Sequence, residues 1–494
     1  MAYDYAPFPY VAPPGLTAPE SRHPVAIVGA GPIGLAMAID LAGHGIKSVV
    51  LDDNNVVSVG SRAICWAKRT LEIFDRLGVG ARMRDKGITW KVGRLFHGHD
   101  EVYSFDLLPE EGHKYPAFIN LQQYYVEQYL VERAQELSDL IDLRFLNKVT
   151  DHTDHGSHVR LAVETPDGNY DLEADYYIAA EGAGSPTRKR MNLPFDGQTF
   201  EEHFLIVDVE LAHSPFETDE PERWFWFAPP FHTGQSALLH KQPDNIYRID
   251  LQLGPDTDPR TEAAEEKVIP RIKAIIGDMP FRLDWMSVYK FRCAKLDRFV
   301  HNRVLFVGDS AHVVSPFGAR GGNGGIQDVD NLGWKLAAVL NGAPATLLGS
   351  YDDERCHGAQ ENILNSARAT NFMTPKTEIE ALFRNETLAL ASKHPFARKL
   401  INSGRLSQPC SLANQSLQTG SHPLVGCALF DLPMGNGWLV EQAQGRFCLL
   451  TLDTQDWQTP AGVDTLPQPN PPERTQRYGA TGAFQQRPDG HICA

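Results

Sequence analysis

Short apolar runs alternate with glycine turns near the amino terminus. Residues 25–28 form an apolar run that a glycine ends, which is typical of a buried strand. Residues 35–45 have helical spacing and end at a glycine, and residues 47–53 form a second apolar run that ends in aspartates. The pattern predicts a strand, a helix and a second strand in this order.

Apolar and polar positions alternate in the middle of the chain. This alternation, together with many aromatic and β-branched residues, predicts an antiparallel sheet with one covered face. The segments that show it are residues 204–212, 223–231, 235–242 and 246–254. Further on, helical spacing predicts long helices over residues 331–342 and 347–373. From about residue 405 the composition shifts to a proline-rich region in which residues 446–453 are typical of a strand.

Composition restricts the class of protein. The 494 residues suit two or three domains. A formal net charge of −16 argues against nucleic acid or an anionic membrane as a partner. No apolar run approaches the length of a membrane span, and the amino terminus lacks the pattern of a secretory signal. Seven scattered cysteines without a CxxC pair argue against disulfides or a metal site and favour the cytoplasm.

The first candidate motif is a dinucleotide-binding turn. Gly29, Gly31 and Gly34 have the GxGxxG spacing between the first strand and the helix, and Asp52 ends the second strand. Gly29 would make the tight turn, Gly31 would let a pyrophosphate approach the backbone, and Gly34 would let helix and strand pack closely. Asp52 would bind ribose hydroxyls. The alternative is a turn without a ligand, and the motif alone does not separate FAD from NAD.

Two further motifs follow in the chain. An apolar strand leads into Glu181-Gly182 and a basic stretch, and a second strand ends in Gly308-Asp309. After it, five glycines fall between Gly318 and Gly325, at the start of a predicted helix, where a ligand would lie against bare backbone.

The order of these motifs resembles that of the single-component FAD-dependent aromatic hydroxylases, the p-hydroxybenzoate hydroxylase and phenol hydroxylase group. The resemblance covers residues 23–405 and is greatest for the 3-(3-hydroxyphenyl)propionate hydroxylase-like branch. It implies an α/β fold in which a Rossmann-like FAD-binding domain holds an inserted antiparallel β-sheet substrate domain, with a thioredoxin-like appendix at the carboxyl end. The implied boundaries are 1–22 for an extended arm, 23–199 with 286–405 for the FAD domain, 200–285 for the substrate domain and 406–494 for the appendix.

The resemblance also implies roles for single residues. Arg62 would contact the pyrophosphate, Gln123 or its neighbour Gln122 the flavin side, and Asp309 the ribityl chain. The isoalloxazine ring would lie over Pro316, Gly321, Gly322, Asn323, Gly324 and Gly325. The helix that follows would point its positive end, about half an elementary charge, at the flavin. The chain departs from the family pattern at two positions. Glu181 stands where the family usually has aspartate, and Arg320 stands where it often has glutamine. The positive charge of Arg320 would raise the reduction potential of the flavin or bind an anionic substrate.

The candidate substrate and catalytic residues come from the predicted sheet. His240, Tyr247 and Arg248 are the catalytic candidates, and Trp224, Trp226 and Arg320 are the substrate candidates. Strand alternation places Trp224 with Trp226 on one face, and Arg248 with Asp250 on one face. The alternative for each is an ordinary core or surface residue, and His240 is the kind of histidine that is often structural.

The resemblance implies a monooxygenase that uses FAD, NADH or NADPH, and O2 to hydroxylate a phenolic small molecule through a C4a-hydroperoxyflavin, without a metal. Three alternatives remain: an FAD oxidase or dehydrogenase, a flavin-bound scaffold without activity, and a halogenase, because residues 224–230 are similar to a WxWxxP stretch. The carboxyl-terminal region, which lacks CxxC, is expected to serve oligomerisation or scaffolding, with a homodimer as the candidate assembly.

Overall fold

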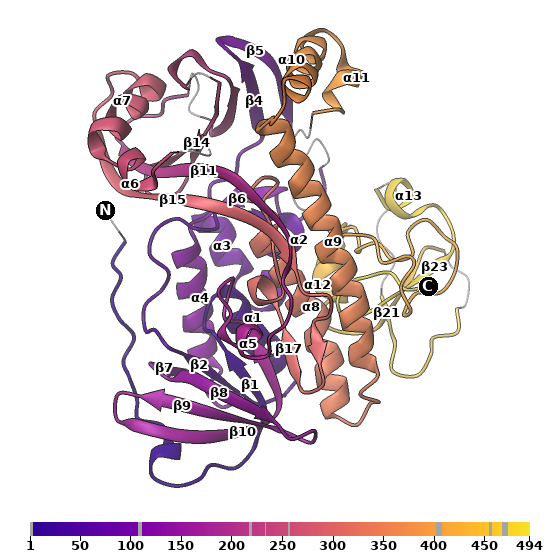
Figure 1. Ribbon diagram of the computed structural model, residues 1–494. Coiled ribbons are helices and arrows are strands. Elements are labelled where there is room, and N and C mark those ends of the chain that lie inside the picture. Colours follow the sequence, from indigo (N-terminus) through magenta and orange to yellow (C-terminus); the bar gives the residue numbers. More distant parts are fainter. Residues whose placement is uncertain are drawn as a thin grey trace.

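The computed structural model describes residues 3–106, 111–216, 220–232, 234–254, 257–401, 408–453, 457–466 and 473–494. Within these ranges the chain forms two eight-stranded sheets, one three-stranded sheet and two two-stranded sheets, with helices packed between and beside the large sheets (Figure 1). The predicted α/β class is confirmed. The predicted boundary between residues 405 and 406 lies outside the described residues.

The first sheet is built on the amino-terminal strand. Its order is β16-β17-β10-β1-β2-β7, and β8 and β9 extend it as antiparallel partners of β10. The strand pairs from β17 to β7 are parallel. The bounds are β1 (His23–Val28), β2 (Ser48–Asp52), β7 (Ile141–Phe145), β8 (Lys148–Asp154), β9 (Val159–Thr165), β10 (Gly168–Ala179), β16 (Val300–His301) and β17 (Val304–Phe306).

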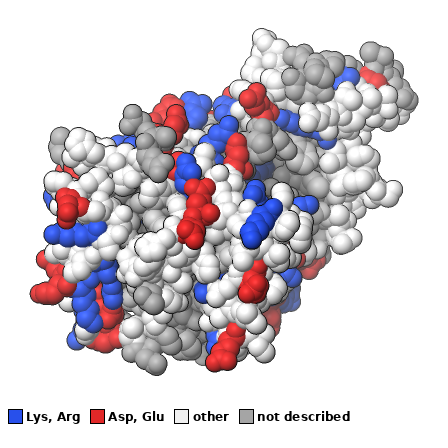
Figure 2. All heavy atoms as spheres, turned by 90° about the horizontal axis from the view of Figure 1, so that it is seen from above, with Lys and Arg blue, Asp and Glu red and all other residues white. Residues whose placement is uncertain are grey.

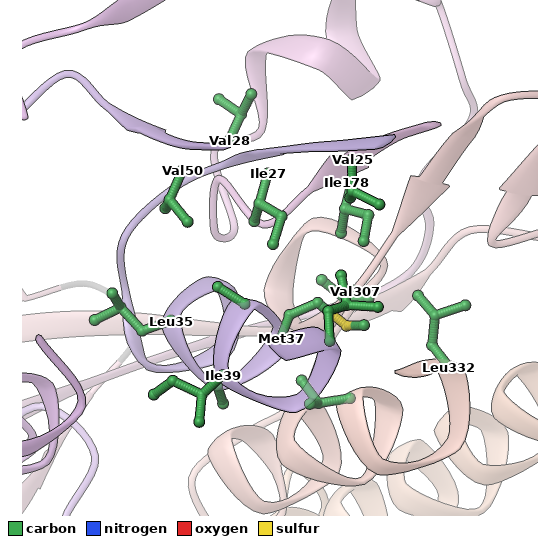
Figure 3. Close-up of a cluster of buried hydrophobic side chains, with 14 of the residues drawn as sticks. Val25, Ile27, Val28, Leu35, Met37, Ile39, Val50, Ile178, Val307 and Leu332 are labelled. Atoms are coloured by element: carbon green, nitrogen blue, oxygen red, sulfur yellow. The ribbon is translucent and has the colours of Figure 1, made fainter. Parts of the chain in front are cut away.

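Helices cover this sheet because its strands are apolar on both faces. The helix α1 (Pro32–Gly43) contacts both α4 (Gln123–Glu136) and α8 (Gly321–Leu340). Figure 3 shows the result: side chains of β1 and α1, such as Val25, Ile27 and Met37, share one core with Leu332 of α8. The shorter helices nearby are α2 (Lys68–Arg76), α3 (Gly80–Lys86) and α5 (Pro186–Arg190).

Two glycines of α8 serve this packing. A Cβ atom at Gly325 would lie 2.7 Å from the Ile33 side chain, and one at Gly333 would lie 1.6 Å from a carboxylate oxygen of Asp40. Both glycines therefore allow α8 to lie close to α1. Part of the glycine content of this segment is thus explained by helix packing, without any ligand.

The second sheet has the order β18-β15-β11-β14-β13-β12-β4-β5. Its bounds are β4 (Val92–His97), β5 (Asp100–Asp106), β11 (Asp196–Leu211), β12 (Glu222–Phe227), β13 (Ser236–Lys241), β14 (Ile246–Leu253), β15 (Phe281–Lys295) and β18 (His312–Val313). This sheet is wider than the predicted segment 200–285, and it is mixed, because β12 pairs with β4 in parallel. The reason lies in β12, whose large side chains on both faces favour an interior position with a neighbour on each edge.

Different helices cover the two faces of the second sheet. The helix α7 (Glu265–Ile276) packs on one face through Val268, Ile272 and Ile276. The other face meets residues of α9 (Leu347–Met373) and α10 (Glu378–Lys393), and α11 (Pro395–Arg398) follows. A short helix, α6 (Pro259–Glu262), precedes α7.

The carboxyl-terminal region forms a small body beside α8 and α9 (Figure 1). It has its own apolar cluster around Leu450 and a sheet of order β22-β21-β23. Its likeness to thioredoxin stays a prediction. The elements are β19 (Pro433–Met434), β20 (Gly437–Trp438), α12 (Leu439–Ala443), β21 (Cys448–Thr451), β22 (Asp464–Leu466), α13 (Glu473–Tyr478) and β23 (Ala483–Gln486). In the described ranges, no helix is long and apolar enough to cross a membrane.

Candidate cofactor site and facing pocket

The glycine turn after β1 has the geometry of a phosphate-binding loop. Gly29 has a φ of 110°, and an added Cβ would lie 2.4 Å from the Ala180 carbonyl oxygen. At Gly34 an added Cβ would lie 1.9 Å from the Gly29 carbonyl oxygen. At Gly31 it would meet no atom within 4 Å. Two glycines therefore close the turn, whereas Gly31 faces open space at the start of α1.

Asp52 lies beside this turn, at the end of β2. Its carboxylate accepts hydrogen bonds from the backbone N–H groups of Ala30 and Asn54. Burial raises the pKa of Asp52 to about 6. A carboxylate so near the start of α1 has the position at which the ribose of a dinucleotide binds.

Gln123 and Arg62 have different environments. The Gln123 side chain accepts from the Ala63 N–H and donates to Glu127, so it fixes the segment that carries Arg62. Arg62 itself is exposed. Gln122 is fully buried and donates weakly to the Pro243 carbonyl. The structure therefore separates a holding side chain, Gln123, from an accessible cation, Arg62.

Asp309 lies in the short helix η3 (Gly308–Ser310), directly after β17. Its side chain is exposed, yet burial is the largest cause that raises its pKa. The Asp309 carboxylate is thus accessible to solvent and also surrounded by protein, so it lies in a recess. This recess adjoins the glycine turn, because the Gly308 α-carbon would be 3.2 Å from a Cβ at Gly325 and Ile33 of α1 contacts both glycines.

A buried triad that the sequence analysis missed holds this recess in place. Asp328 of α8 accepts from the Gly308 N–H at 2.9 Å, from His312 Nε2 at 2.7 Å and from Arg355 Nε at 2.7 Å. Asp328, His312 and Arg355 form the triad, and all three are buried, as is Gly308. The available signal was an acidic residue in a helix that also carries many apolar positions, because such a residue needs a partner when it is buried.

The segment before α8 approaches the same recess. Gly318 and Ala319 have φ values of 90° and 52°, and Pro316 is exposed. Gly322 lies against Trp66, since an added Cβ would be 3.2 Å from its ring. The first N–H groups of α8, from Gly321 onward, have no intrahelical acceptor, as at every helix start. These donors and the small residues beside them suit a flat ring with acceptor atoms at its edge.

Asn323, Gly324 and Arg320 have protein contacts of their own. Asn323 donates to the carbonyls of Cys65 and Ala319 and accepts from the Ala67 N–H, so it fixes the strand β3 (Cys65–Ala67), which pairs with β6 (Phe118–Asn120). A Cβ at Gly324 would be 3.0 Å from Asn362 of α9. Arg320 is buried and donates to Asn362 at 3.1 Å. The side chains of Asn323 and Arg320 hold this segment in place, which leaves backbone as the surface for a ring.

Glu181, the residue that departs from the family pattern, is structural in this chain. Its carboxylate accepts from Ser185 Oγ, from the Thr187 N–H and hydroxyl, and from the Tyr177 hydroxyl. It therefore caps the first turn of α5. These contacts leave little of the carboxylate free for a pyridine nucleotide.

One face of the second sheet turns toward the cofactor recess. Arg248 donates to the Ser61 and Arg62 carbonyls and to Asp250. His240 lies opposite Arg248 on β13, and its Nε2 is 3.2 Å from Asp250. Burial and the nearby Arg223 lower the pKa of His240 to about 4, so the imidazole is neutral near pH 7. Arg248 holds the Asp250 carboxylate at a pKa well below its usual range.

Arg223 is unusual on this face because its positive charge is buried and no carboxylate among the described residues forms an ion pair with it. It is 7% exposed. Its Nη1 atom contacts Cys65 Sγ at 3.5 Å, its Nε atom has no hydrogen-bond partner, and its guanidinium lies 4.9 Å from the Phe225 ring centre. The Cys65 carbonyl in turn accepts from the Asn323 side chain, so Arg223 lies near the first turn of α8.

An apolar wall continues this face beside Arg223 and His240. Phe225 and Leu238 follow them on the same side of their strands, since alternate residues share a face. Phe204 lies edge-on to Phe317 of the glycine-rich segment, with ring centres 5.1 Å apart. The face thus combines polar groups at one end with aromatic side chains at the other, opposite the residues that would carry a flat ring.

Three predicted pocket residues lie on the wrong face, and the structure corrects this part of the prediction. Trp224, Trp226 and Tyr247 belong to the cluster that packs against α7, away from Arg248. The alternation itself was predicted correctly: the tryptophans share one face, and Arg248 and Asp250 share the other. The sequence does not encode which face meets the cofactor domain, because α7 and the glycine-rich segment decide it. Both tryptophans of the stretch that is similar to WxWxxP therefore lie in the core beside α7, so this stretch gives no support for a halogenase.

These observations fit FAD. For the adenosine half of FAD, Gly31 offers free backbone and Asp52 offers a carboxylate. Asp309 offers a carboxylate in a recess between the sites of the adenosine half and the flavin half, and residues 316–322 offer backbone to the planar ring.

Comparison with known proteins agrees with this geometry. Residues 22–366 match the family model described as an FAD binding domain, and the chain belongs to that family. It is similar to a flavin-dependent monooxygenase of Mycobacteroides abscessus, with 28% identity over 95% of this chain and 96% of the relative. The predicted resemblance to FAD-dependent aromatic hydroxylases is confirmed, and the chain is placed among the flavin-dependent monooxygenases.

Two other proteins extend the comparison. A 3-(3-hydroxy-phenyl)propionate/3-hydroxycinnamic acid hydroxylase of Mycolicibacterium gilvum is 28% identical over 76% of this chain and 65% of its own length. Among solved structures, the anhydrotetracycline hydroxylase OxyS from Streptomyces rimosus superposes with a TM-score of 0.72 and 26% identity, over 96% of this chain and 95% of that one.

The position of Asp309 gives a direct test of the recess. Replacing Asp309 with alanine should weaken FAD binding about tenfold or more, because a hydrogen bond to a charged group contributes roughly 1.5–3 kcal/mol. The fold should be kept, because the side chain is exposed and makes no hydrogen bond to protein in the described residues. Titration of the apoprotein with FAD, followed by flavin fluorescence, measures the change. Unchanged affinity would remove Asp309 from the site.

Proposed function

We propose that this protein is an NAD(P)H-dependent FAD monooxygenase that hydroxylates a negatively charged phenolic substrate. One atom of O2 forms a bond to a ring carbon and ends as a hydroxyl group in place of the ring hydrogen. The other atom leaves as water, with both electrons supplied by NAD(P)H and one proton from the solvent. FAD, when bound, supplies this redox chemistry, because it accepts hydride and activates O2.

The observation that carries the proposal is the buried guanidinium of Arg223. A buried charge without a partner is costly, so such a group is usually paired when the protein works. In this chain it lies beside Cys65, next to the residues that would carry the flavin ring, and at one end of an aromatic wall. A phenolate or a ring carboxylate would provide the missing negative charge and also fill the aromatic space.

His240 is placed to orient a phenol hydroxyl. Its Nε2 lies against the Asp250 carboxylate, which favours the tautomer with hydrogen on Nε2. Nδ1 is then an acceptor, and it is buried without a partner. We propose that Nδ1 accepts the hydrogen bond of the substrate hydroxyl while Arg223 offsets the developing charge. The aromatic wall excludes water from the reacting carbon, which limits wasteful loss of reduced oxygen as H2O2.

The remaining residues hold the cofactor and its segments. Arg62 would contact the pyrophosphate, Asp52 the ribose and Asp309 the ribityl chain, whereas Gln123, Asn323 and Asp328 fix the segments that carry them. Arg248 joins the substrate sheet to the carbonyl groups of residues 61 and 62 and so sets the distance between substrate and cofactor.

Arg223→Met tests the assignment. We expect kcat/KM for a phenol that carries a carboxylate to fall about 10–150-fold, the equivalent of a lost charge-assisted hydrogen bond of roughly 1.5–3 kcal/mol. The methionine keeps the length and apolar contacts of the arginine stem, so the fold should remain. NAD(P)H oxidation in air, with mass spectrometry of the product formed under labelled O2, is the measurement.

Two controls accompany this variant. Arg223→Lys, which keeps the positive charge, should recover part of the loss, and a neutral phenol should be affected less than the anionic one. An equal loss for both substrates would overturn the anion-binding role. Oxidation of phenols without any NAD(P)H would instead support an oxidase, and bound flavin with no turnover on the panel would support a scaffold.

A further inference from the structure

An apolar stripe on α10 and α11 is exposed to solvent. Among the described residues, ten large apolar side chains are exposed, and six of them fall within residues 379–400. Their exposed fractions range from 43% at Leu390 to 79% at Ile379. The six residues, called here the α10 stripe, are Ile379, Leu382, Phe383, Leu390, Phe396 and Leu400. Single exposed apolar residues are common, but a cluster of this kind marks an interaction surface.

The α10 stripe lies on a helix that is fixed by its other side. Leu388 and Ala391 are fully buried in the cluster that covers the second sheet, and Thr377 with Glu380 forms a capping box at the helix start. The stripe residues Ile379, Phe383 and Leu390 recur at the spacing of one helix face. The helix therefore presents a regular apolar face outward. Fraying does not explain the exposure.

Two charged residues lie inside the stripe and are unusual there. Glu386 and Lys393 are both exposed, and they are seven positions apart, which is about two turns or roughly 10.5 Å along the same face. Within the described residues neither forms an ion pair. One acid and one base on a single face are self-complementary: an antiparallel copy of the same helix places each acid opposite a base.

We propose that the α10 stripe is the interface of a homodimer, in which α10 packs antiparallel against α10 of a second copy. The two-fold axis passes between Glu386 and Lys393, so that each Glu386 pairs with Lys393 of the other copy. Leu390 lies next to this axis and faces Leu390 of the second copy, and Phe396 and Leu400, which follow the end of α10 at Lys393, extend the apolar area. The same patch meets itself, as a two-fold interface requires.

A second copy fits this surface better than the other candidate, a lipid membrane. The chain carries a net charge of −16, which disfavours approach to an anionic surface. Figure 2 shows the molecule from above, which is the side on which α10 and α11 lie in Figure 1. In this view acidic (red) and basic (blue) residues lie next to each other, with wide uncharged areas between them. Such mixed charge suits pairing with specific opposite charges more than attraction to one uniform surface.

Charge reversal tests the pairing on the complete FAD-loaded protein. Sedimentation equilibrium should give a dimer for the wild-type chain, and Glu386→Lys or Lys393→Glu alone should raise the dissociation constant about tenfold or more, since like charges then face each other across the axis. The double variant, with both changes in one chain, should return toward wild-type affinity. A mixture of the two single variants should form a heterodimer.

A matched pair of apolar variants separates the stripe from general effects. Leu382→Glu should give monomers, whereas Val11→Glu, at a position that is 72% exposed on the amino-terminal arm, should leave the dimer unchanged. Melting temperature and flavin content of each variant verify that it folds. Any one of four results would overturn the proposal. These are a monomeric wild-type chain, a dimer that survives Leu382→Glu, a double variant whose dimer affinity does not recover, and a monomer that co-sediments with phosphatidylcholine vesicles.

Discussion

A Gly31→Val variant is expected to fold like the wild-type protein and to be purified without FAD. The backbone at Gly31 is extended, with φ −73° and ψ −177°, which valine adopts readily. An added Cβ meets no protein atom within 4 Å, so the branched side chain occupies only the space in front of the turn. The phosphates would need that space. We expect the flavin content per chain to fall to nearly zero, as measured by absorbance of FAD released from the denatured protein.

Gly34→Ala is the matched control for this prediction. Its Cβ would lie 1.9 Å from the Gly29 carbonyl oxygen and 3.2 Å from the Ala180 side chain, so it disturbs the packing of helix on strand. This variant should lower the melting temperature of the protein without bound FAD, whereas Gly31→Val should not. A yellow Gly31→Val protein with a full complement of flavin would show that the pyrophosphate does not lie at this turn.

Arg487→Met is expected to be strongly destabilising, although the residue is only seven positions before the last one of the sequence. Arg487 is 1% exposed and pairs with Glu354 of α9 and with Asp489. Glu354 also accepts from Lys335 of α8, at 2.8 Å. Removing the arginine leaves two buried carboxylates with one nearby lysine. Loss of one partner from a buried ion pair costs about 3–5 kcal/mol.

The pH dependence of unfolding gives this prediction a sign. Arg487 and Lys335 lower the pKa of Glu354 to about 2, below its ordinary value of 4.5. The stabilisation from this group is therefore complete above about pH 4.5 and is lost as the pH falls toward 2. In Arg487→Met the pKa of Glu354 should rise, so its stability should depend less on pH in this range. Thermal unfolding at a series of pH values measures both effects.

Arg446→Met provides the control within the same carboxyl-terminal body. Arg446 pairs with Asp464, but both side chains are about half exposed, and such pairs contribute about 0–1 kcal/mol. The double variant Glu354→Gln with Arg487→Met should be more stable than Arg487→Met alone, because one orphaned carboxylate is removed. Equal melting temperatures for Arg487→Met and Arg446→Met would contradict a structural role for the buried network.

Tertiary contacts explain why several residues were missed or misplaced from the sequence. The pattern along the chain predicts no role for the segment from Arg487 to His491, although it meets α8 and α9 in the interior. Asp328 was read only as part of a helix, although it fixes Gly308 and His312. In both cases the partners are distant in the chain, so no local pattern reports them.

The amino-acid sequence by itself determined the local requirements of the cofactor site: glycines where a backbone φ is positive or two main chains touch, an acid at the end of β2, and alternation along the strands of the second sheet. These follow from the sterics of each residue and its near neighbours. Only the tertiary structure decided which face of the sheet, the one with Arg223 and His240 or the one with Trp224 and Tyr247, turns toward the recess. That choice depends on burial against α7 on one side and the glycine-rich segment on the other, and burial is a property of the assembled chain.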